Sequence, residues 1–495
     1  MTLHLKRIGI ETSGENIAFL SARCPDYSPE SFHSLYRVRI SGGGREIMCT
    51  LNIVESNGMM GDDCLGLTSG AFATLGLPEG TPVTLQLAPP PKSLDSVRRK
   101  ISGAALDAGE IGEIVADIAS HRYSKMEISA FLVACAAFMT TDEVLSLTRA
   151  MAGVGTTLTW DAPQVMDKHC IGGIPGNRTS MIVVPIVAAH GLPIPKTSSR
   201  AITSPAGTAD TMEVLANVDV DIDRMKQVVG ETNGCLVWGG RVNLSPADDI
   251  MITVERPLGI DTPEQMVASI LSKKLSAGST HLLIDMPVGP SAKVRSESQA
   301  ARLRKLFEYI GTSLGLVIDI IVTDGSQPVG RGIGPALEAR DVMAVLRNEE
   351  GAPPDLRERA LTLAGRVLEF DPALRGGDGI VAARKLLENG EALAAMNRII
   401  AAQGPAPQSI DIGRLVHEVT APAAGEVSAI DCYRVARIAR LAGAPTSKGA
   451  GIDLMKKTGD SVKRGEPLYR IHAALETDLT FATEMATQDH GFRID

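Results

Sequence analysis

Aromatic side chains and basic residues are both scarce in this chain of 495 residues. Phe, Tyr and Trp together make up 3% of it, and 49 Lys and Arg stand against 58 Asp and Glu, which gives a net charge of -9. Proteins that bind polynucleotides use a basic surface and aromatic rings on which bases stack. We therefore expect no nucleic-acid partner.

Paired cysteines and long apolar runs are also missing from the sequence. The seven cysteines are scattered and include no C-x-x-C pair, which is typical of thiols in a reducing compartment. No apolar run reaches the roughly 18 uncharged residues of a membrane helix, and Glu11 and Glu15 interrupt the start of the chain before a signal-peptide core can form. The nine histidines show no ligand spacing typical of zinc. We expect a soluble cytoplasmic protein without a membrane partner, a metal or a cofactor.

The first third of the chain contains two different patterns. At roughly 100 to 200 residues per domain, a chain of this length predicts three or four structural units. Residues 1–88 read as short strands between glycine-rich turns and end at a Pro89-Pro90-Pro91 linker, which predicts a β-rich N-terminal domain. Residues 95–155 turn helical, with apolar residues at i, i+3, i+4 and i+7 from Ile111.

The rest of the chain mixes strands and helices. Strand-like runs alternate with helical runs over 156–345, which predicts a central α/β sheet domain. The apolar run 181–189 fits either a strand or a helix. Residues 346–410 are helical, and 411–495 read as a C-terminal α+β domain. The predicted fold class is therefore multi-domain α/β.

One segment of this acidic chain contains no acidic residue. From Lys168 to Ala209 there are 42 consecutive residues without Asp or Glu, although 58 acids in 495 residues would place about five there. The basic residues of the same window are Lys168, Arg178, Lys196 and Arg200. Because a local excess of positive charge attracts anions, the window predicts an anion-binding segment.

Two loops in this window, 168–180 and 197–208, combine glycine with hydroxyl side chains. Glycine lets backbone N–H groups approach an anion closely, and a helix start adds unpaired N–H groups. Neither loop matches the P-loop or the dinucleotide-binding motif, and an ordinary turn is the alternative for either loop alone. Together they predict two phosphates, or one phosphate held from both sides.

A further helix is predicted between Thr262 and Gly278. Its start fits a capping box with proline at the first helical position, and Gly278 is a stop signal. Ser269 and Lys273 would share one face of it, and the alternative for both is a solvated surface. Asp261 is by default a cap whose pKa the helix dipole lowers, so it could act as a general acid only if it were buried.

These motifs resemble the thymidine and pyrimidine-nucleoside phosphorylase family. The match is carried by Lys168-His169-Cys170-Ile171-Gly172-Gly173, Ser199-Arg200, Gly207-Thr208 and the segment from Ser269 to Lys274. The extra N-terminal domain and the stretch 176–210 are similar to the AMP phosphorylase branch, whose bacterial members are commonly named type-2 thymidine phosphorylases. The resemblance covers nearly the whole chain.

The resemblance implies a reaction and an assembly. Inorganic phosphate, as co-substrate, would attack the anomeric carbon of a nucleoside or nucleotide and release the free base and a sugar 1-phosphate with inversion. The helical domain would be discontinuous, with about 250–277 joining 95–155, and an active-site cleft would separate it from the α/β domain. Cleft closure would keep an oxocarbenium-like transition state from water. The chain would form a homodimer or a larger homo-oligomer.

The resemblance also assigns roles to individual residues. Phosphate or nucleotide contacts fall to Lys168, Ser199 and Thr208 and to the backbone of Gly173, Arg200, Ala201, Ile202, Thr203 and Ser204. Base contacts fall to Ser269 and Lys273, with Lys293 as a further nucleotide contact. Asp261 and His169 are the candidate proton donors, and a structural loop histidine is the alternative for His169.

Three features differ from the family pattern. The arginine that thymidine enzymes use on the base has no counterpart here, because Val254 aligns with it and Arg256 is offset by two, which disfavours a strict thymidine phosphorylase. Cys170 stands where most members have serine, and because a thiol is a weak donor, Thr179 or Ser180 is expected to make its phosphate contact. The loop around Arg178 is one residue longer than in thymidine enzymes, and the guanidinium groups of Arg178 and Arg200 suit an additional phosphate. This favours a nucleoside 5′-monophosphate such as AMP, CMP or UMP as substrate, beside a pyrimidine nucleoside.

Three other functions stay open from the sequence. A strict thymidine phosphorylase would convert thymidine and phosphate to thymine and 2-deoxyribose 1-phosphate. A phosphoribosyltransferase of related architecture would need magnesium and acidic ligands near the loops, which the acid-free window disfavours. A non-catalytic nucleotide-binding regulator would keep the loops and release no base.

Overall fold

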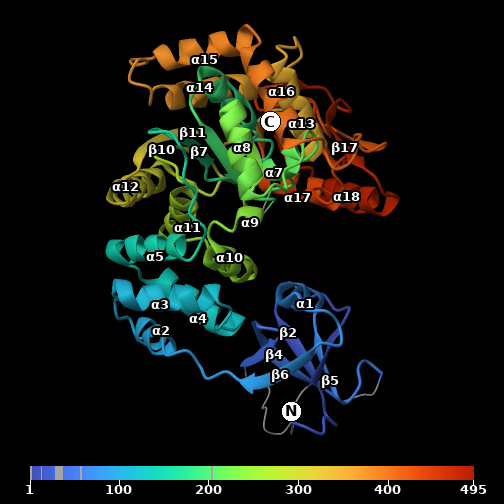
Figure 1. Cartoon of the computed structure of the whole chain (residues 1–495). Helices are drawn as coiled ribbons and strands as arrows, with labels where there is room; N and C mark the ends of the chain where they lie inside the picture. The colour runs from blue at the N-terminus through green and yellow to red at the C-terminus, as the bar shows by residue number, and fades with distance from the viewer. Residues whose placement is uncertain (1–2, 13, 28–36, 56–57, 202–203) are drawn as a thin grey trace. The chain divides into compact units, whose positions relative to one another are not determined.

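The computed structural model describes residues 3–12, 14–27, 37–55, 58–201 and 204–495. The chain divides into two compact units (Figure 1), one made of 1–154 with 246–268 and the other of 155–245 with 269–495. Among the described residues, no helix is long and apolar enough to cross a membrane.

A closed β-barrel forms the start of the first unit, with strand order β1-β5-β2-β4-β3-β6. Its elements are β1 (Leu3–Arg7), β2 (Ile17–Ser21), β3 (Arg37–Gly42), β4 (Arg45–Val54), β5 (Cys64–Leu67), α1 (Ser69–Leu75) and β6 (Pro82–Leu87). Side chains alternate between the two faces of each strand, so Leu3 and Leu5 are buried while His4 is exposed. The predicted β-rich domain is confirmed as a barrel, which has no open sheet edge.

Helices make up the rest of the first unit. They are α2 (Leu94–Ile101), α3 (Ala108–Ala119), α4 (Lys125–Ala137), α5 (Thr141–Gly153), α10 (Pro246–Leu258) and the first residues of α11 (Pro263–Ser276). Capping boxes start α3, α4 and α5, and the apolar stripe that begins at Ile111 is buried. Although α10 is remote in sequence, it packs against α3 and α4, and Gln265 of α11 donates to the carbonyl oxygen of Leu132 at 3.2 Å.

A parallel sheet of order β11-β10-β7 lies at the centre of the second unit. Its strands are β7 (Met166–Cys170), β10 (His281–Val288) and β11 (Val317–Asp324), and a second parallel pair is β8 (Ile194–Ser198) with β9 (Gly234–Trp238). In the register of β7 and β10, Cys170 lies opposite Asp285. Strands β7 and β8 contact each other, and Arg178 after β7 donates to Thr208 after β8, so the two glycine-containing loops lie close together.

The helices of this α/β part are α6 (Ser180–His190), α7 (Thr208–Met212), α8 (Ile222–Thr232), α9 (Gly239–Val242), α12 (Glu297–Ser313), α13 (Pro335–Leu346), α14 (Pro354–Leu368), α15 (Asp378–Glu388) and α16 (Glu391–Gln403). The ambiguous apolar run belongs to α6, which packs between the β8–β9 pair and helices α14 and α16. A helix that is apolar all round belongs in an interior, and α6 is buried from Ser180 to Ala188.

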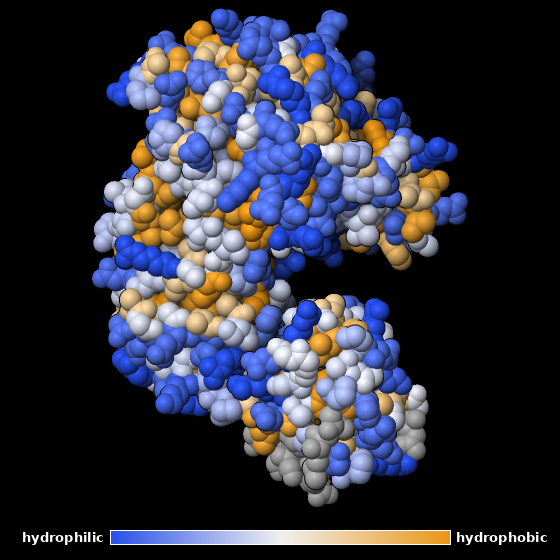
Figure 2. Space-filling view, viewed as in Figure 1, coloured by the Kyte–Doolittle hydropathy of each residue, from blue (hydrophilic) through white to orange (hydrophobic). Residues whose placement is uncertain are grey.

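Short strands and two helices follow at the C-terminal end of the second unit. They are β12 (Gly332–Ile333), β13 (Leu415–Thr420), β14 (Gly425–Ile430), α17 (Cys432–Leu441), β15 (Gly451–Leu454), β16 (Ser461–Val462), β17 (Pro467–Ala473), α18 (Glu476–Gln488) and β18 (Phe492–Ile494). Strand β12 comes from the α/β part but pairs with β15, so it joins this segment to that part. Figure 2 shows hydrophobic residues scattered among hydrophilic ones on the visible face of each unit. The predicted multi-domain α/β class is confirmed.

Candidate active site

The middle residue of strand β7, Lys168, is buried completely. The ammonium of Lys168 donates to Thr179 Oγ1 at 2.8 Å and lies 3.4 Å from Asp285 Oδ2. A buried charge is tolerated only with such partners. The strand therefore delivers a fixed positive charge to the start of the first loop.

A chain of hydrogen bonds continues from Lys168 along this loop. The Thr179 hydroxyl donates to Asn177 Oδ1 at 3.1 Å, and Asn177 Nδ2 donates to Cys170 Sγ at 3.3 Å. Burial, followed by the nearby Asp285 carboxylate, raises the pKa of the Cys170 thiol to about 12. The thiol is therefore neutral and already accepts a bond within the loop, while Thr179, expected to replace it, sits directly beside the lysine.

The glycine turn of this loop leaves no space for a side chain at Gly173. Its φ is +95°, and a Cβ placed there would lie 2.8 Å from the backbone nitrogen of Lys293. Gly172 also has a positive φ of +92°, but a Cβ there would meet open space. Gly173 therefore lets the turn approach the backbone at Lys293, whose own side chain is exposed.

Arg178 joins the two loops. Its Nη1 donates to Thr208 Oγ1 of the second loop at 3.2 Å, and its Nε lies 2.6 Å from Glu338 Oε2 of α13. Arg178 and Glu338 are both buried. The structure thus brings the predicted residues Arg178 and Thr208 together and gives the guanidinium an acidic partner that the sequence did not predict.

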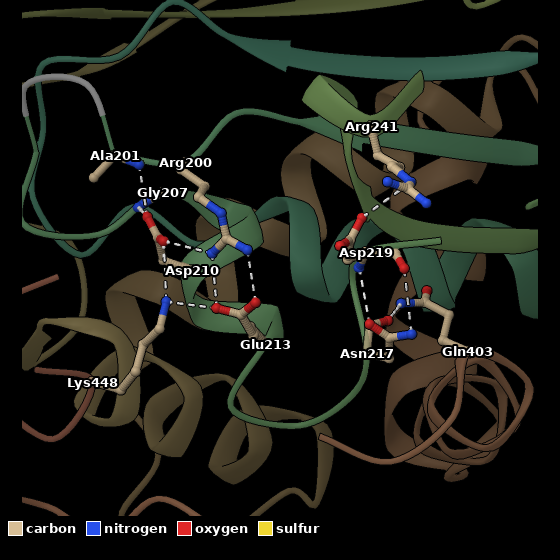
Figure 3. A network of polar contacts seen from close by, with 10 residues as sticks. All are labelled: Arg200, Ala201, Gly207, Asp210, Glu213, Asn217, Asp219, Arg241, Gln403 and Lys448. Atoms are coloured by element: carbon tan, nitrogen blue, oxygen red, sulfur yellow. Dashed lines mark hydrogen bonds and ion pairs between the residues drawn. The ribbon is translucent and has the colours of Figure 1, made fainter. Parts of the chain in front are cut away.

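The second loop is closed by a network around Arg200 (Figure 3). Arg200 donates to both carboxylate oxygens of Glu213, at 2.8 and 2.7 Å, lies 3.2 Å from Asp210 Oδ1 and stacks on the ring of Trp238. Asp210 Oδ2 accepts the backbone N–H groups of Ala201 at 2.6 Å and Gly207 at 2.9 Å. Asp210 therefore fixes both ends of the loop.

The other predicted residues of this loop are placed differently. Ser204 donates its hydroxyl to the carbonyl oxygen of Ala206, and Ser199 is exposed. Ile202 and Thr203 lie outside the described residues. The loop therefore presents Ser199 to solvent, while Ser204 is used within the loop itself.

Acidic side chains from other elements surround the acid-free window in space. Asp285 of β10, Glu338 of α13, and Asp210 and Glu213, which follow the window, pair with its basic residues. The physical reason is that cations removed from water need counter-charges. The local positive excess expected from the window is therefore smaller than the sequence count implies.

A second buried charge cluster lies on the other face of β7. Asp167, which is completely buried, lies 2.8 Å from Lys274 Nζ and 3.5 Å from Lys196 Nζ, and Ser279 donates to it at 3.1 Å. Burial and the Lys274 charge lower the pKa of Lys196 to about 7. The sequence reasoning missed this cluster, although the alternation Asp167-Lys168 along a strand was a usable signal. The cluster ties α11 to the strand that carries Lys168.

Helix α11 carries the two predicted base-binding residues. The helix begins as predicted, because Thr262 Oγ1 accepts the backbone N–H of Gln265 at 3.2 Å. Ser269 and Lys273 lie one turn apart in the part of α11 that belongs to the second unit, and both are half-buried. The next residue of α11, Lys274, forms the ion pair with Asp167, so this pair holds the helix that carries Ser269 and Lys273 against β7.

The two candidate proton donors differ in environment. Burial, together with the charges of Lys274, Lys196, Lys168 and Lys273, holds the pKa of His169 well below its usual value. His169 is therefore neutral at pH 7 and can donate a hydrogen bond from its N–H, but it does not supply an imidazolium proton. Asp261 lies in the first unit between α10 and α11, and its side chain is exposed.

Family models match three parts of the chain. The helical bundle domain of the glycosyl transferase family matches 94–155, and the a/b domain of the same family matches 162–393. The pyrimidine nucleoside phosphorylase C-terminal domain matches 426–490. The a/b match includes β7, both loops and α11.

Full-length relatives and solved structures agree with these matches. Proteins named "putative thymidine phosphorylase" from Rhodopseudomonas palustris and Bradyrhizobium diazoefficiens are 58% and 55% identical, over 100% of this chain and 96% of each relative. In fold, the chain is similar to anthranilate phosphoribosyltransferase from Thermus thermophilus, with a TM-score of 0.52 and 20% identity over 62% of this chain and 99% of that one. The chain therefore belongs to the thymidine and pyrimidine-nucleoside phosphorylase family and is a pentosyltransferase.

Proposed function

We propose that this enzyme catalyses phosphorolysis of the N-glycosidic bond of a nucleoside 5′-monophosphate or a pyrimidine nucleoside. The observation that carries the proposal is the Lys168 ammonium, held beside Thr179 next to a glycine turn that has open space at Gly172. Such an arrangement suits a phosphate dianion. The positive charge of Lys168 would offset the repulsion between the bound phosphate and a nearby anion, either the Asp285 carboxylate or the 5′-phosphate of a nucleotide substrate.

The proposed reaction needs no reactant other than the nucleoside or nucleotide, inorganic phosphate and one proton. A phosphate oxygen forms a bond to the anomeric carbon, and the bond from that carbon to the base nitrogen breaks with its electron pair. The base takes up one proton, and a sugar 1-phosphate remains; a nucleotide substrate would give a 1,5-bisphosphate. No residue becomes covalently attached, so positioning and charge neutralisation supply most of the catalysis.

For the base, we propose contacts from α11 and β7. Ser269 and Lys273 would hold the base, and neutral His169 would donate a hydrogen bond to it. Asp261, whose side chain is exposed in this structure, would supply the proton once bound substrate buries it. If Asp261 is the proton donor, Asp261→Asn lowers kcat far more than His169→Asn does. A larger loss of kcat in His169→Asn would instead identify His169 as the proton donor.

Two kinds of observation favour two substrate classes. The relatives' names and the matched C-terminal domain favour a pyrimidine nucleoside. The positions of Arg178 and Arg200 beside the loops favour an additional phosphate, provided that a guanidinium can exchange its carboxylate partner for the substrate.

The test is release of free base from thymidine, AMP, CMP and UMP, each with and without inorganic phosphate. We expect phosphate-dependent release from at least one of them, and release from thymidine alone would make the enzyme a strict thymidine phosphorylase. Lys168→Met should abolish the reaction, while the control Lys226→Met, at an exposed position of α8, should retain it. No release from any substrate would contradict the proposed function and favour a non-catalytic nucleotide binder.

A further inference from the structure

Arg200 is the most accessible member of the network that closes the second loop. Its side chain is 35% exposed, whereas that of Asp210 is 3% exposed. If Arg200 alone neutralised Asp210 and Glu213, turning it toward a substrate phosphate would leave two shielded carboxylates without a counter-charge. Breaking a buried ion pair in this way is strongly unfavourable.

A second cation, from the C-terminal part of the chain, contacts the same two carboxylates. Lys448 Nζ lies 3.1 Å from Asp210 Oδ1 and 2.8 Å from Glu213 Oε2 (Figure 3). Its side chain is 12% exposed, and its carbonyl oxygen accepts the backbone N–H of Ala336 at the start of α13. The lysine therefore has a fixed backbone and stays beside the carboxylates independently of Arg200.

Asp210 must also remain in place for the loop to keep its form. Its Oδ2 holds the N–H groups of Ala201 and Gly207, while Oδ1 faces both Arg200 and Lys448. The Lys448 ammonium can therefore balance Oδ1 without disturbing the loop. The ring of Trp238 covers one face of the Arg200 guanidinium. The N–H groups at the edge of the guanidinium stay available to donate either to a carboxylate or to a phosphate.

We propose that Lys448 is a positioning residue that keeps Asp210 and Glu213 paired while Arg200 turns from them to a phosphate group of the substrate. The proposal rests on the proposed function and adds a role for the C-terminal segment in it. The ligand chemistry is a phosphate dianion. Its source is either inorganic phosphate or the 5′-phosphate of a nucleotide, and kinetics can distinguish the two.

The test is a double-mutant cycle of Lys448→Met and Arg200→Met, with KM measured separately for inorganic phosphate and for each nucleoside or nucleotide. We expect each single variant to raise the same KM by about tenfold, and the double variant to equal Arg200→Met alone, because Lys448 acts through Arg200. A rise confined to inorganic phosphate identifies that source, and a rise confined to nucleotides identifies the 5′-phosphate.

Two further variants separate positioning from general stability. Lys448→Arg keeps the charge and should restore KM, and Lys448→Gln keeps a donor without the charge and should behave like Lys448→Met. Lys456→Met is the matched control, because Lys456 pairs with Glu466 inside the C-terminal segment. It should leave KM unchanged, and thermal melting of each variant shows whether the fold is retained.

Unchanged KM values in Lys448→Met and Lys448→Gln, or single effects that multiply in the double variant, would overturn the proposal. If the wild-type protein catalyses no phosphorolysis, the proposed function fails by itself. The same four proteins of the cycle are then compared by calorimetric titration with inorganic phosphate and with AMP. In that comparison, equal affinities for wild type and Lys448→Met would overturn the inference.

Discussion

Lys168 combines two roles that can be measured separately. Its ammonium neutralises the buried carboxylate of Asp285 and also provides the charge proposed to bind phosphate. The first role concerns the free energy of folding, and the second concerns the reaction. A substitution that restores one role without the other can therefore tell them apart.

We predict that Lys168→Met lowers the free energy of unfolding by about 3 kcal/mol, because Asp285 is left buried without its cation. The double variant Lys168→Met with Asp285→Asn should recover much of that stability, because no unpaired charge remains. Phosphorolysis should be lost in both. Urea denaturation and the base-release assay measure the two effects, and recovery of activity in the double variant would contradict the assigned role of Lys168.

His169 gives a prediction about pH. Its pKa is lowered in the folded state, so below about pH 6.5 the unfolded chain binds a proton that the folded chain does not bind. Its contribution to stability is therefore fully present above pH 6.5 and is lost as the pH falls toward the folded-state pKa. In His169→Asn, the loss of stability between pH 6.5 and pH 5 should be smaller, as measured by urea midpoints. An NMR titration that placed the pKa of His169 above 6.5 would contradict this.

At the residue scale, the sequence predicted which side chains gather but not how they are paired. Lys168 donates a hydrogen bond to Thr179, and Arg178 donates one to Thr208. All four residues belong to the two loops that were predicted to bind phosphate. Their acidic partners Asp285 and Glu338 lie more than 100 positions away along the chain, and no local pattern indicates such pairs. Only the tertiary fold decides which carboxylate compensates a buried cation.

At the scale of elements, the conformation of the turn between β7 and α6 depends more on Gly173 than on Gly172. Gly172→Ala should cost only the strain of a positive φ, about 1 kcal/mol. Gly173→Ala adds a clash with the backbone at Lys293, so the turn itself must shift. We predict that Gly173→Ala raises KM for phosphate much more than Gly172→Ala does, and equal KM values in the two variants would contradict this account of the turn.

Element boundaries followed local signals where those signals were strong. The start of α11 and the apolar stripe of α3 were predicted from capping and periodicity and are confirmed. The run that forms α6 stayed ambiguous, because a segment buried on all sides has no polar face to reveal its period. Burial of that kind is a property of the packed molecule and is weakly encoded in the segment itself.

The whole molecule contains more than one hydrophobic core. The barrel has its own core, as does the C-terminal α+β segment, and the largest cluster surrounds α6 and the central sheet. The C-terminal segment nevertheless reaches the second loop through Lys448. That contact gives a domain remote in sequence a direct connection to the proposed site.

Assembly remains a prediction at this scale. We expect a homodimer or a larger homo-oligomer, so sedimentation equilibrium should give at least twice the chain mass of 52.2 kDa. The measurement should be repeated over a range of protein concentrations, because dimerisation depends on concentration. A monomer at every concentration tested would contradict this expectation.

The central claim is that phosphate bound beside Lys168 attacks the sugar. The most direct measurement is ³¹P NMR of the wild-type enzyme with inorganic phosphate and the substrate that releases base. The account predicts loss of the inorganic phosphate signal, and growth of a sugar 1-phosphate signal in a one-to-one ratio with free base, with neither change in Lys168→Met. Base release without consumption of phosphate would show hydrolysis and would contradict the account.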